Sequence, residues 1–128
     1  MSTPEVAPYR NRVSGQRALF AFGLTQAFFS EERKRIPPIM DALLAAFADL
    51  EGRFGVKVLG TLDDDQTMVG ATDTWPWTCY ILADVPDRAA VTSICNLIRQ
   101  TEVGDARLWK YLKIEARLGR PLFFAEQT

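Results

Sequence analysis

The stretch that decides the fold is Leu108-Trp109-Lys110-Tyr111-Leu112-Lys113-Ile114-Glu115-Ala116-Arg117-Leu118. Read with the two-residue period of a β-strand, its side chains fall on two faces of different chemistry. Apart from Lys110, one face is apolar and carries Leu108, Leu112, Ile114, Ala116 and Leu118. The other face carries two aromatic rings and charges of both signs: Trp109, Tyr111, Lys113, Glu115 and Arg117. The stretch therefore predicts a strand over 107–118 with one face on a core and the other lining a cavity.

The first half of the chain predicts a strand followed by a helix. A first strand is expected at 17–26, where an unalternating run of Leu and Phe predicts burial on both faces, as in a central strand. Ser30 before Glu31 and Glu32 is a helix-start signal, which Pro37-Pro38 interrupts. Either a new helix begins at the prolines or one helix kinks there. An apolar stripe then predicts a helix that ends near residue 53: Ile39, Met40, Leu43, Leu44, Phe47 and Leu50.

The second half predicts two further strands before a second helix. Strands are expected at 56–62 and 77–83, with a weakly paired piece around 68–71 between them. The acids and proline of 84–87 predict the start of a helix, whose buried stripe is Ala90, Val91, Ile94, Cys95 and Ile98. The order βαββαβ predicts a ferredoxin-like α+β fold, with a four-stranded antiparallel sheet and two helices on one face. Residues 1–15 are expected to be a polar leader and 16–128 one domain, with a packed tail around Phe123 and Phe124.

Composition excludes several function classes. The 128 residues include 15 basic and 16 acidic ones, so no basic excess favours nucleic acid as a partner. No apolar run reaches the roughly 20 residues that span a bilayer, and the polar N-terminus does not resemble a secretory signal. We therefore expect a cytoplasmic protein without a membrane partner. Cys79 and Cys95 lack CxxC spacing; reduced thiols are the expectation, and a disulfide is the alternative.

The chain contains no histidine. This removes the commonest metal ligand and the commonest general base at neutral pH. The run Asp63-Asp64-Asp65 lacks calcium-loop spacing and is interpreted as a solvated turn. No glycine-rich phosphate cradle is present either. We therefore expect neither a metal nor a cofactor.

The candidate catalytic residues are Glu115, Tyr111 and Lys113. A carboxylate beside aromatic walls would be partly desolvated and usable for proton transfer, so Glu115 is the first candidate. Its alternative role is an ion pair with Lys113 or Arg117, and the two roles are compatible. Tyr111 and Lys113 would stabilise an oxyanion, although Tyr111 is equally interpretable as an interface aromatic.

The candidate substrate-binding residues surround that carboxylate. Arg117 would hold a ligand carboxylate bidentately, and Trp109, Trp77 and Trp75 would stack on a planar ligand. Ordinary packing is the alternative for each tryptophan. Asp73 would reach the cavity mouth, unless it caps its own turn. Phe22 of the first strand completes the set. A sheet face this aromatic would be a large exposed patch, which a second copy packed face to face would cover, so a homodimer is expected.

The element order, size and aromatic inner face resemble the dimeric α+β barrel superfamily. Within it, the chain is similar to the darcynin-like family, some of whose members sit with indole-acetate catabolism genes. The likeness rests on short motifs: Ser30-Glu31-Glu32-Arg33, Val56-Lys57-Val58 before Asp63-Asp64-Asp65, and Asp73 before the third strand. The chain departs from it in Trp75-Pro76-Trp77 and in residues 114–121. The resemblance implies the barrel fold and the dimer, but no catalytic residue, because many relatives rely on a histidine.

These observations favour a small-molecule enzyme of bacterial aromatic or secondary metabolism. The reaction would be an isomerisation, a cyclisation or a cofactor-free oxygenation of a flat aromatic or polyketide-like substrate. The alternative is a non-catalytic ligand-binding or accessory protein that uses the same cavity. A third reading is an interaction module whose aromatic face docks another protein. The sequence leaves open whether the protein is an enzyme.

Overall fold

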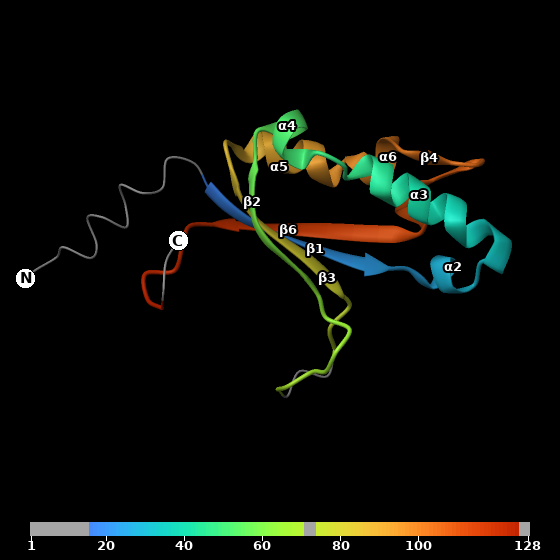
Figure 1. Cartoon of the computed structure of the whole chain (residues 1–128), viewed down its shortest axis with the longest axis horizontal. Coiled ribbons are helices and arrows are strands. Elements are labelled where there is room, and N and C mark those ends of the chain that lie inside the picture. The colour runs from blue at the N-terminus through green and yellow to red at the C-terminus, as the bar shows by residue number, and fades with distance from the viewer. Residues whose placement is uncertain (1–15, 71–73, 126–128) are drawn as a thin grey trace, which may run out of the picture.

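The computed structural model describes residues 16–70 and 74–125. A four-stranded antiparallel sheet is covered by helices on one face (Figure 1). Its strands lie in the order β2-β3-β1-β6, with the bounds β1 Gln16–Leu24, β2 Lys57–Asp63, β3 Cys79–Val85 and β6 Leu112–Gly119. The short strands β4, Glu102–Val103, and β5, Ala106–Arg107, form a separate two-stranded sheet. The predicted α+β class and four-stranded antiparallel sheet are thereby confirmed.

The helical layer consists of several short helices rather than two long ones. Between β1 and β2 lie α2 Gln26–Phe29, the 3-10 turn η1 Arg33–Arg35, α3 Ile36–Ala46 and α4 Leu50–Phe54. Between β3 and β4 lie α5 Arg88–Cys95 and α6 Leu97–Gln100, and the 3-10 turn η2 Leu108–Lys110 precedes β6. None of the helices in the described parts of the chain is long and apolar enough to cross a membrane.

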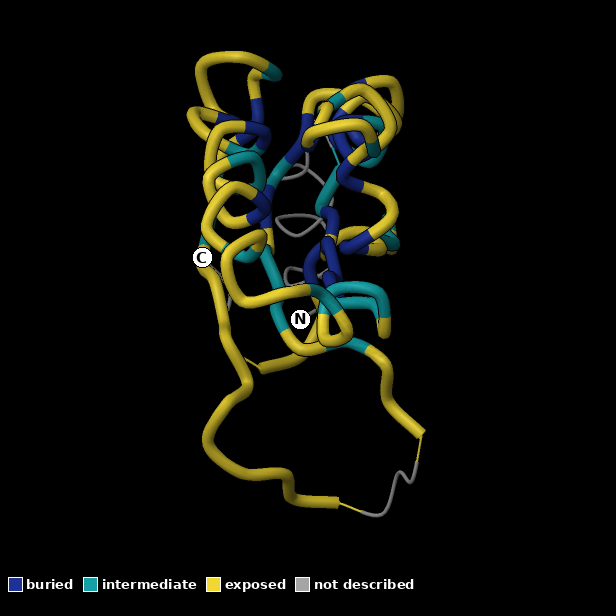
Figure 2. Tube along the Cα trace, turned by 90° about the vertical axis from the view of Figure 1, so that its right-hand side faces the viewer, coloured by how far each residue is buried: buried dark blue, intermediate teal, exposed yellow. Residues whose placement is uncertain are grey.

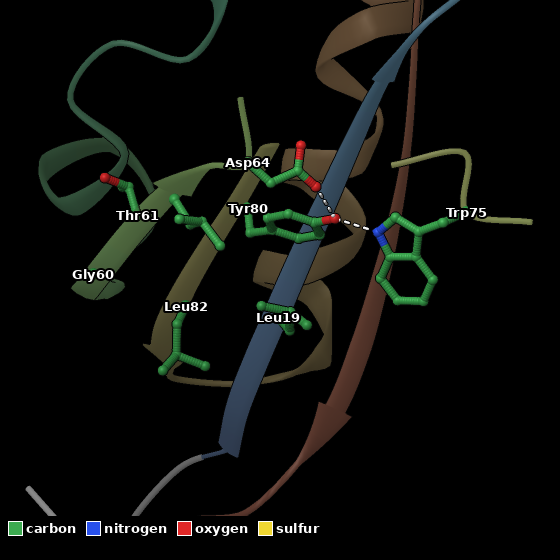
Figure 3. A pocket seen from close by; sticks show the side chains of 8 residues that line it. Leu19, Gly60, Thr61, Asp64, Trp75, Tyr80 and Leu82 are labelled. Atoms are coloured by element: carbon green, nitrogen blue, oxygen red, sulfur yellow. Dashed lines mark hydrogen bonds between the residues drawn. The ribbon is translucent and has the colours of Figure 1, made fainter. Parts of the chain in front are cut away.

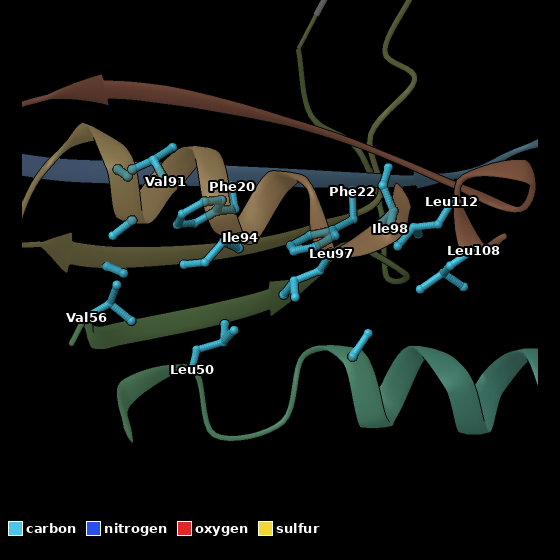
Figure 4. Close-up of a cluster of buried hydrophobic side chains, with 14 of the residues drawn as sticks. Phe20, Phe22, Leu50, Val56, Val91, Ile94, Leu97, Ile98, Leu108 and Leu112 are labelled. Atoms are coloured by element: carbon cyan, nitrogen blue, oxygen red, sulfur yellow. The ribbon is translucent and has the colours of Figure 1, made fainter. Parts of the chain in front are cut away.

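The hydrophobic core lies between this helical layer and the sheet (Figure 4). Alternate residues of β1 point into it, and Phe20 is only 1% exposed among Val91, Ile94 and their neighbours. Leu19, on the other face of β1, is 37% exposed. The prediction that β1 is buried on both faces is therefore wrong at Leu19. The strand is central in the sheet, but no helix of the described chain covers its second face, which is buried at Ala21 and exposed at Leu19.

The last strand begins five residues later than predicted, at Leu112. Residues 108–110 form η2, whose turn is closed by the bond from the Tyr111 amide to the Leu108 carbonyl, 2.9 Å. This turn carries Leu108 into the core and buries Tyr111, which is 1% exposed, while Trp109 is 60% exposed. The two-residue period holds only from Leu112 onward. The prediction that Trp109 and Tyr111 share a face with Lys113 is therefore wrong.

The first predicted helix starts and ends differently. Ser30 does not begin a helix but closes α2, its amide bonding to the carbonyls of Gln26 and Phe28. α3 has Pro37 and Pro38 in its first turn, where a missing amide proton costs no helical bond. Of the two alternatives, a new helix at the prolines is the one observed.

The predicted continuous helix to residue 53 is interrupted at Asp49. Its backbone adopts the left-handed conformation, with φ 50° and ψ 50°, and its side chain accepts a bond from the Gly52 amide. This cap starts α4 in a new direction and still buries Leu50 in the core. The apolar stripe is therefore shared between two helices.

The remaining observations concern the connections. Within the predicted helix start at 84–87, Asp87 caps α5 and accepts a bond from the Ala90 amide at 2.9 Å. Residues 68–70 form no strand, while Ala71 lies outside the described residues, as do residues 1–15. Figure 2 shows that the described parts of the connection between β2 and β3 extend away from the layered body, and residues 64–70 and 74–76 are exposed. Phe123 and Phe124 contact each other but are 77% and 57% exposed, so the prediction of a packed tail is wrong.

Candidate functional site

The sheet face without helices is here called the open face. On this face, side chains of β3, β1 and β6 lie next to each other in rows that cross the strands. Residues directly opposite each other on antiparallel strands point to the same face. Leu19 of β1 lies between Leu82 of β3 and Arg117 of β6. Ala21 lies in the same way between Tyr80 and Glu115. The β3 side of the open face is thus apolar and aromatic, and the β6 side is charged.

A hollow of about 550 Å³ occupies the apolar side of the open face (Figure 3). Strands β1, β2 and β3 supply most of its lining, and the connection between β2 and β3 supplies the rest. The lining residues are Leu19, Gly60, Thr61, Leu62, Asp64, Trp75, Tyr80 and Leu82. Its leucines are partly exposed, so the hollow presents apolar surface to any ligand that enters.

The polar end of the hollow is built around the Tyr80 hydroxyl. This hydroxyl donates to Asp64 Oδ2 at 2.9 Å and accepts a bond from Trp75 Nε1 (Figure 3). The Trp77 carbonyl, at 3.1 Å, is a second acceptor within reach. Because a phenol has one proton, it serves only one of the two acceptors at a time. Burial raises the pKa of Tyr80 above its ordinary value, and neighbouring Asp64 adds to this, so the phenol is neutral at physiological pH.

The segment 75–78 covers the end of the open face at Gly23. A Cβ on Gly23 would lie 2.4 Å from the Pro76 carbonyl oxygen, so only glycine allows this approach. The Thr78 amide donates to the Phe22 carbonyl at 2.8 Å, which fixes the segment to β1. Lys113 Nζ lies 5.8 Å from the centre of the Trp77 ring. Trp75 is thereby positioned beside Tyr80.

The charged side of the open face belongs to β6. Glu115 Oε2 and Arg117 Nη2 form an ion pair at 2.6 Å, one of the two roles that the sequence left open for Glu115. Lys113 lies on the same face, and its Nζ is placed over the Trp77 ring. Among the described residues, the ion pair of Glu115 is with Arg117 and not with Lys113. Across the sheet, Arg17 Nε pairs with Asp84 Oδ1 at 2.9 Å. The structure thus brings together Lys113, Glu115 and Arg117 as predicted.

The structure separates Tyr111 from this group. Its hydroxyl donates to Glu31 Oε2 at 2.7 Å, and this bond raises the pKa of Tyr111 and lowers that of Glu31. Arg35 Nε lies 3.6 Å from the other oxygen of Glu31. Tyr111 therefore ties the loop after α2 to the start of β6, and its hydroxyl is not directed to the open-face hollow.

The other predicted substrate-binding residues are dispersed. Trp109 is exposed in η2, and Phe22 is buried in the core, edge-to-face against Phe47 at 5.2 Å between ring centres. Trp77 lies at the end of the open face, beside Lys113. Asp73 lies outside the described residues.

Of the residues that line the hollow, sequence reasoning named Trp75 as a ligand-stacking candidate and missed the others. Tyr80 and Leu82 could have been found, because they alternate with the core residues Ile81 and Ala83 along β3. Asp64 was interpreted as part of a solvated turn, and no local signal marks it as the acceptor for Tyr80. In the described residues, no three His, Cys, Asp or Glu side chains are placed to hold a metal ion. Cys79 and Cys95 are both free thiols.

No protein-family model matches the chain, and no curated protein matches it. Two crystal structures are similar to it, both of RPA0582, a protein of unknown function from Rhodopseudomonas palustris. The first is 15% identical, with 95% of each chain covered and a TM-score of 0.50. The second, of the methylated protein, is 18% identical, with 95% and 93% coverage and a TM-score of 0.54. At these identities the likeness shows a shared α+β fold.

Proposed function

We propose that the protein binds a flat, mostly apolar small molecule in the open-face hollow. The observation that carries this proposal is the hollow of about 550 Å³, apolar along Leu19 and Leu82 and polar only at one end. Small-molecule sites are typically concave and apolar, with a few polar groups that fix the ligand's orientation. Tyr80 supplies such a group, because its hydroxyl can exchange Asp64 or the Trp75 indole for a ligand atom.

The charges around the hollow favour an aromatic acid as the ligand. A ligand carboxylate would be repelled by Asp64 at the Tyr80 end. Arg117 lies beside Leu19 on the opposite side, two strand spacings from Leu82, or roughly 10 Å. A planar ring over Leu19 and Leu82 would therefore place its carboxylate toward Arg117 and a hydroxyl or N–H toward Tyr80.

A second copy packed on the open face would complete the site. The strand order β2-β3-β1-β6, with helices on one face only, supports a ferredoxin-like unit of the dimeric α+β barrel type. The exposed apolar residues Leu62, Trp75 and Leu82 on this face favour burial against such a copy. Native mass spectrometry of the purified protein should show a homodimer, with the mass of a retained small molecule. A monomer without bound ligand would contradict this arrangement and favour the docking of an unrelated protein.

Isothermal titration calorimetry tests ligand binding directly and does not depend on the indole fluorescence that indole-3-acetate shares with tryptophan. Indole-3-acetate and benzoate are suitable probes. Leu82→Glu should abolish binding by placing a charge in the hollow. Ala45→Glu, on the exposed side of α3, adds the same charge elsewhere and should leave binding intact. Equal affinity of the two variants would contradict the proposed site.

Tyr80→Phe gives a finer test of the same site. Removing the hydroxyl costs one hydrogen bond, about 0.5–1.5 kcal/mol, or roughly 2- to 12-fold in affinity for a ligand that bonds to it. The expected loss is confined to ligands that carry a hydroxyl or N–H group at the end opposite their carboxylate. The same loss for benzoate, which has no such group, would contradict the proposed orientation.

The second candidate function is an enzyme of bacterial aromatic metabolism or biosynthesis. The observation that favours it is the position of Glu115, which faces Tyr80 across Ala21 on the open face. Glu115 would take a proton from a substrate carbon and return it at another position, as in an isomerisation or cyclisation. Tyr80 and Lys113 would stabilise the enolate oxygen, and Arg117 would hold a carboxylate.

Glu115→Gln separates this enzyme from a binding protein. The variant keeps the shape of the side chain but cannot accept a proton, so turnover should be lost while the ligand is still bound. The oligomeric state and circular dichroism spectrum serve as controls for folding. Unchanged turnover would remove Glu115 from the mechanism.

A further inference from the structure

A second hollow, here called the helix groove, lies between α3 and the strands β2 and β3. It measures about 340 Å³. Leu43 and Leu44 line it from α3, and Phe47 lines it from the position that follows α3. Thr61, Cys79 and Ile81 line it from the strands. Asp63 is the one charged side chain among its lining residues in the described chain. The groove therefore offers a largely apolar surface, with its polar side chains on the strand side at Thr61, Asp63 and Tyr80.

The helix groove adjoins the open-face hollow at the edge of the sheet. Thr61, Leu62 and Tyr80 line both spaces. Thr61 pairs with the core-facing Ile81, and Leu62 pairs with the open-face Tyr80, so the two neighbours point to opposite faces of β2. Because β2 is an edge strand, no further strand in the described chain blocks the passage around it.

We propose that the ligand is amphipathic, with an unbranched alkyl chain that runs from its flat head around β2 into the helix groove. This inference rests on the proposed function, because the head occupies the open-face hollow. An alkyl chain fits the groove chemically, since it needs no hydrogen bonds and gains affinity from apolar burial. A second anionic group would instead be repelled by Asp63, and any charged group would lose hydration against the apolar side chains of α3.

The 4-alkylbenzoates, with chains from zero to eight carbons, test this inference in competition with indole-3-acetate. Each methylene that enters the groove should raise affinity about three- to fourfold, until the groove is filled. Leu44→Glu should flatten this dependence on chain length, because Leu44 lines the groove and its 68% exposure lets the variant fold. Ala45→Glu places the same charge one residue away, outside the groove lining, and should keep the dependence.

Cys79 gives an independent readout inside the groove. In a Cys95→Ser variant it is the protein's remaining thiol, so iodoacetamide labels Cys79 alone. Octylbenzoate should slow this labelling at least severalfold, whereas benzoate should not. If benzoate binds and the alkyl chain adds no affinity, this inference is overturned and the proposed function stands. Failure of every benzoate and of indole-3-acetate to bind would overturn both.

Discussion

Gly23→Ala should destabilise the protein by displacing the segment that carries Trp75. The new Cβ would stand 2.4 Å from the Pro76 carbonyl oxygen, where ordinary contacts begin at 3.4 Å. One of the two groups must therefore move by about 1 Å. The segment cannot yield freely, because the Thr78 amide is bonded to the Phe22 carbonyl and the Thr78 carbonyl accepts from the Asp64 amide.

The expected cost follows from this overpacking. Forcing extra volume into a packed contact costs about 1–3 kcal/mol, which lowers the folding equilibrium constant roughly 5- to 150-fold. Urea unfolding followed by circular dichroism measures this loss. Displacement of Pro76 should also move Trp75 away from Tyr80, so the affinity for aromatic acids should fall in the folded variant.

Gly119→Ala is the matched control for this substitution. Gly119 ends β6, and a Cβ there would meet nothing within 4 Å. Both substitutions reduce the entropy of the unfolded chain to the same extent, so their difference isolates the contact with Pro76. The control should change stability by no more than about 0.5 kcal/mol. A Gly23→Ala variant as stable as Gly119→Ala would refute the close approach of Pro76.

Three further predictions concern the core, a helix cap and the response to pH. Phe20→Ala should cost about 3–5 kcal/mol in urea unfolding, because Phe20 is fully buried, and a cost below 1 would contradict its position. Asp87→Ala should cost about 0.5–2 kcal/mol by removing the cap on the Ala90 amide, whereas Asp87→Asn should retain most of it. Tyr111→Phe removes the bond that lowers the pKa of Glu31 below its ordinary 4.5. A carboxyl group whose pKa is lower in the folded chain than in the unfolded chain stabilises the fold at pH values above its unfolded pKa. This stabilisation is lost as the pH falls through its folded pKa. The difference in unfolding free energy between wild type and Tyr111→Phe should therefore shrink from pH 7 to about pH 3. An equal difference at both pH values would refute this coupling.

Local sequence patterns were sufficient to predict the structure where one local interaction dominates. The alternation of Leu112, Ile114 and Ala116 with charged residues correctly predicted which face of β6 packs on the helices, since strand geometry fixes a period of two. Pro37 and Pro38 lie in the first turn of α3, where the missing amide proton of proline costs no helical hydrogen bond. The acids and proline of 84–87 likewise predicted a capped helix start, and Asp87 is the cap.

The pattern failed where distant contacts compete with it. Leu108 fits a continued strand equally well by sequence, but its burial in the core and the bond from its amide to the Thr101 carbonyl favour a turn. That turn alone decides that Tyr111 meets Glu31 instead of a ligand. Nothing near Tyr111 in the sequence identifies Glu31 as its partner, because the two are 80 residues apart.

The sequence by itself determined the α+β class, the inward face of β6 and the grouping of Lys113, Glu115 and Arg117, because each depends on the spacing of neighbouring residues. Only the tertiary structure decided the candidate site. The hollow joins Leu19, Leu62, Tyr80 and Trp75, which come from three strands and a connection. Their proximity depends on the register between strands and on the approach of Pro76 to Gly23, and neither is encoded in any short stretch of the chain.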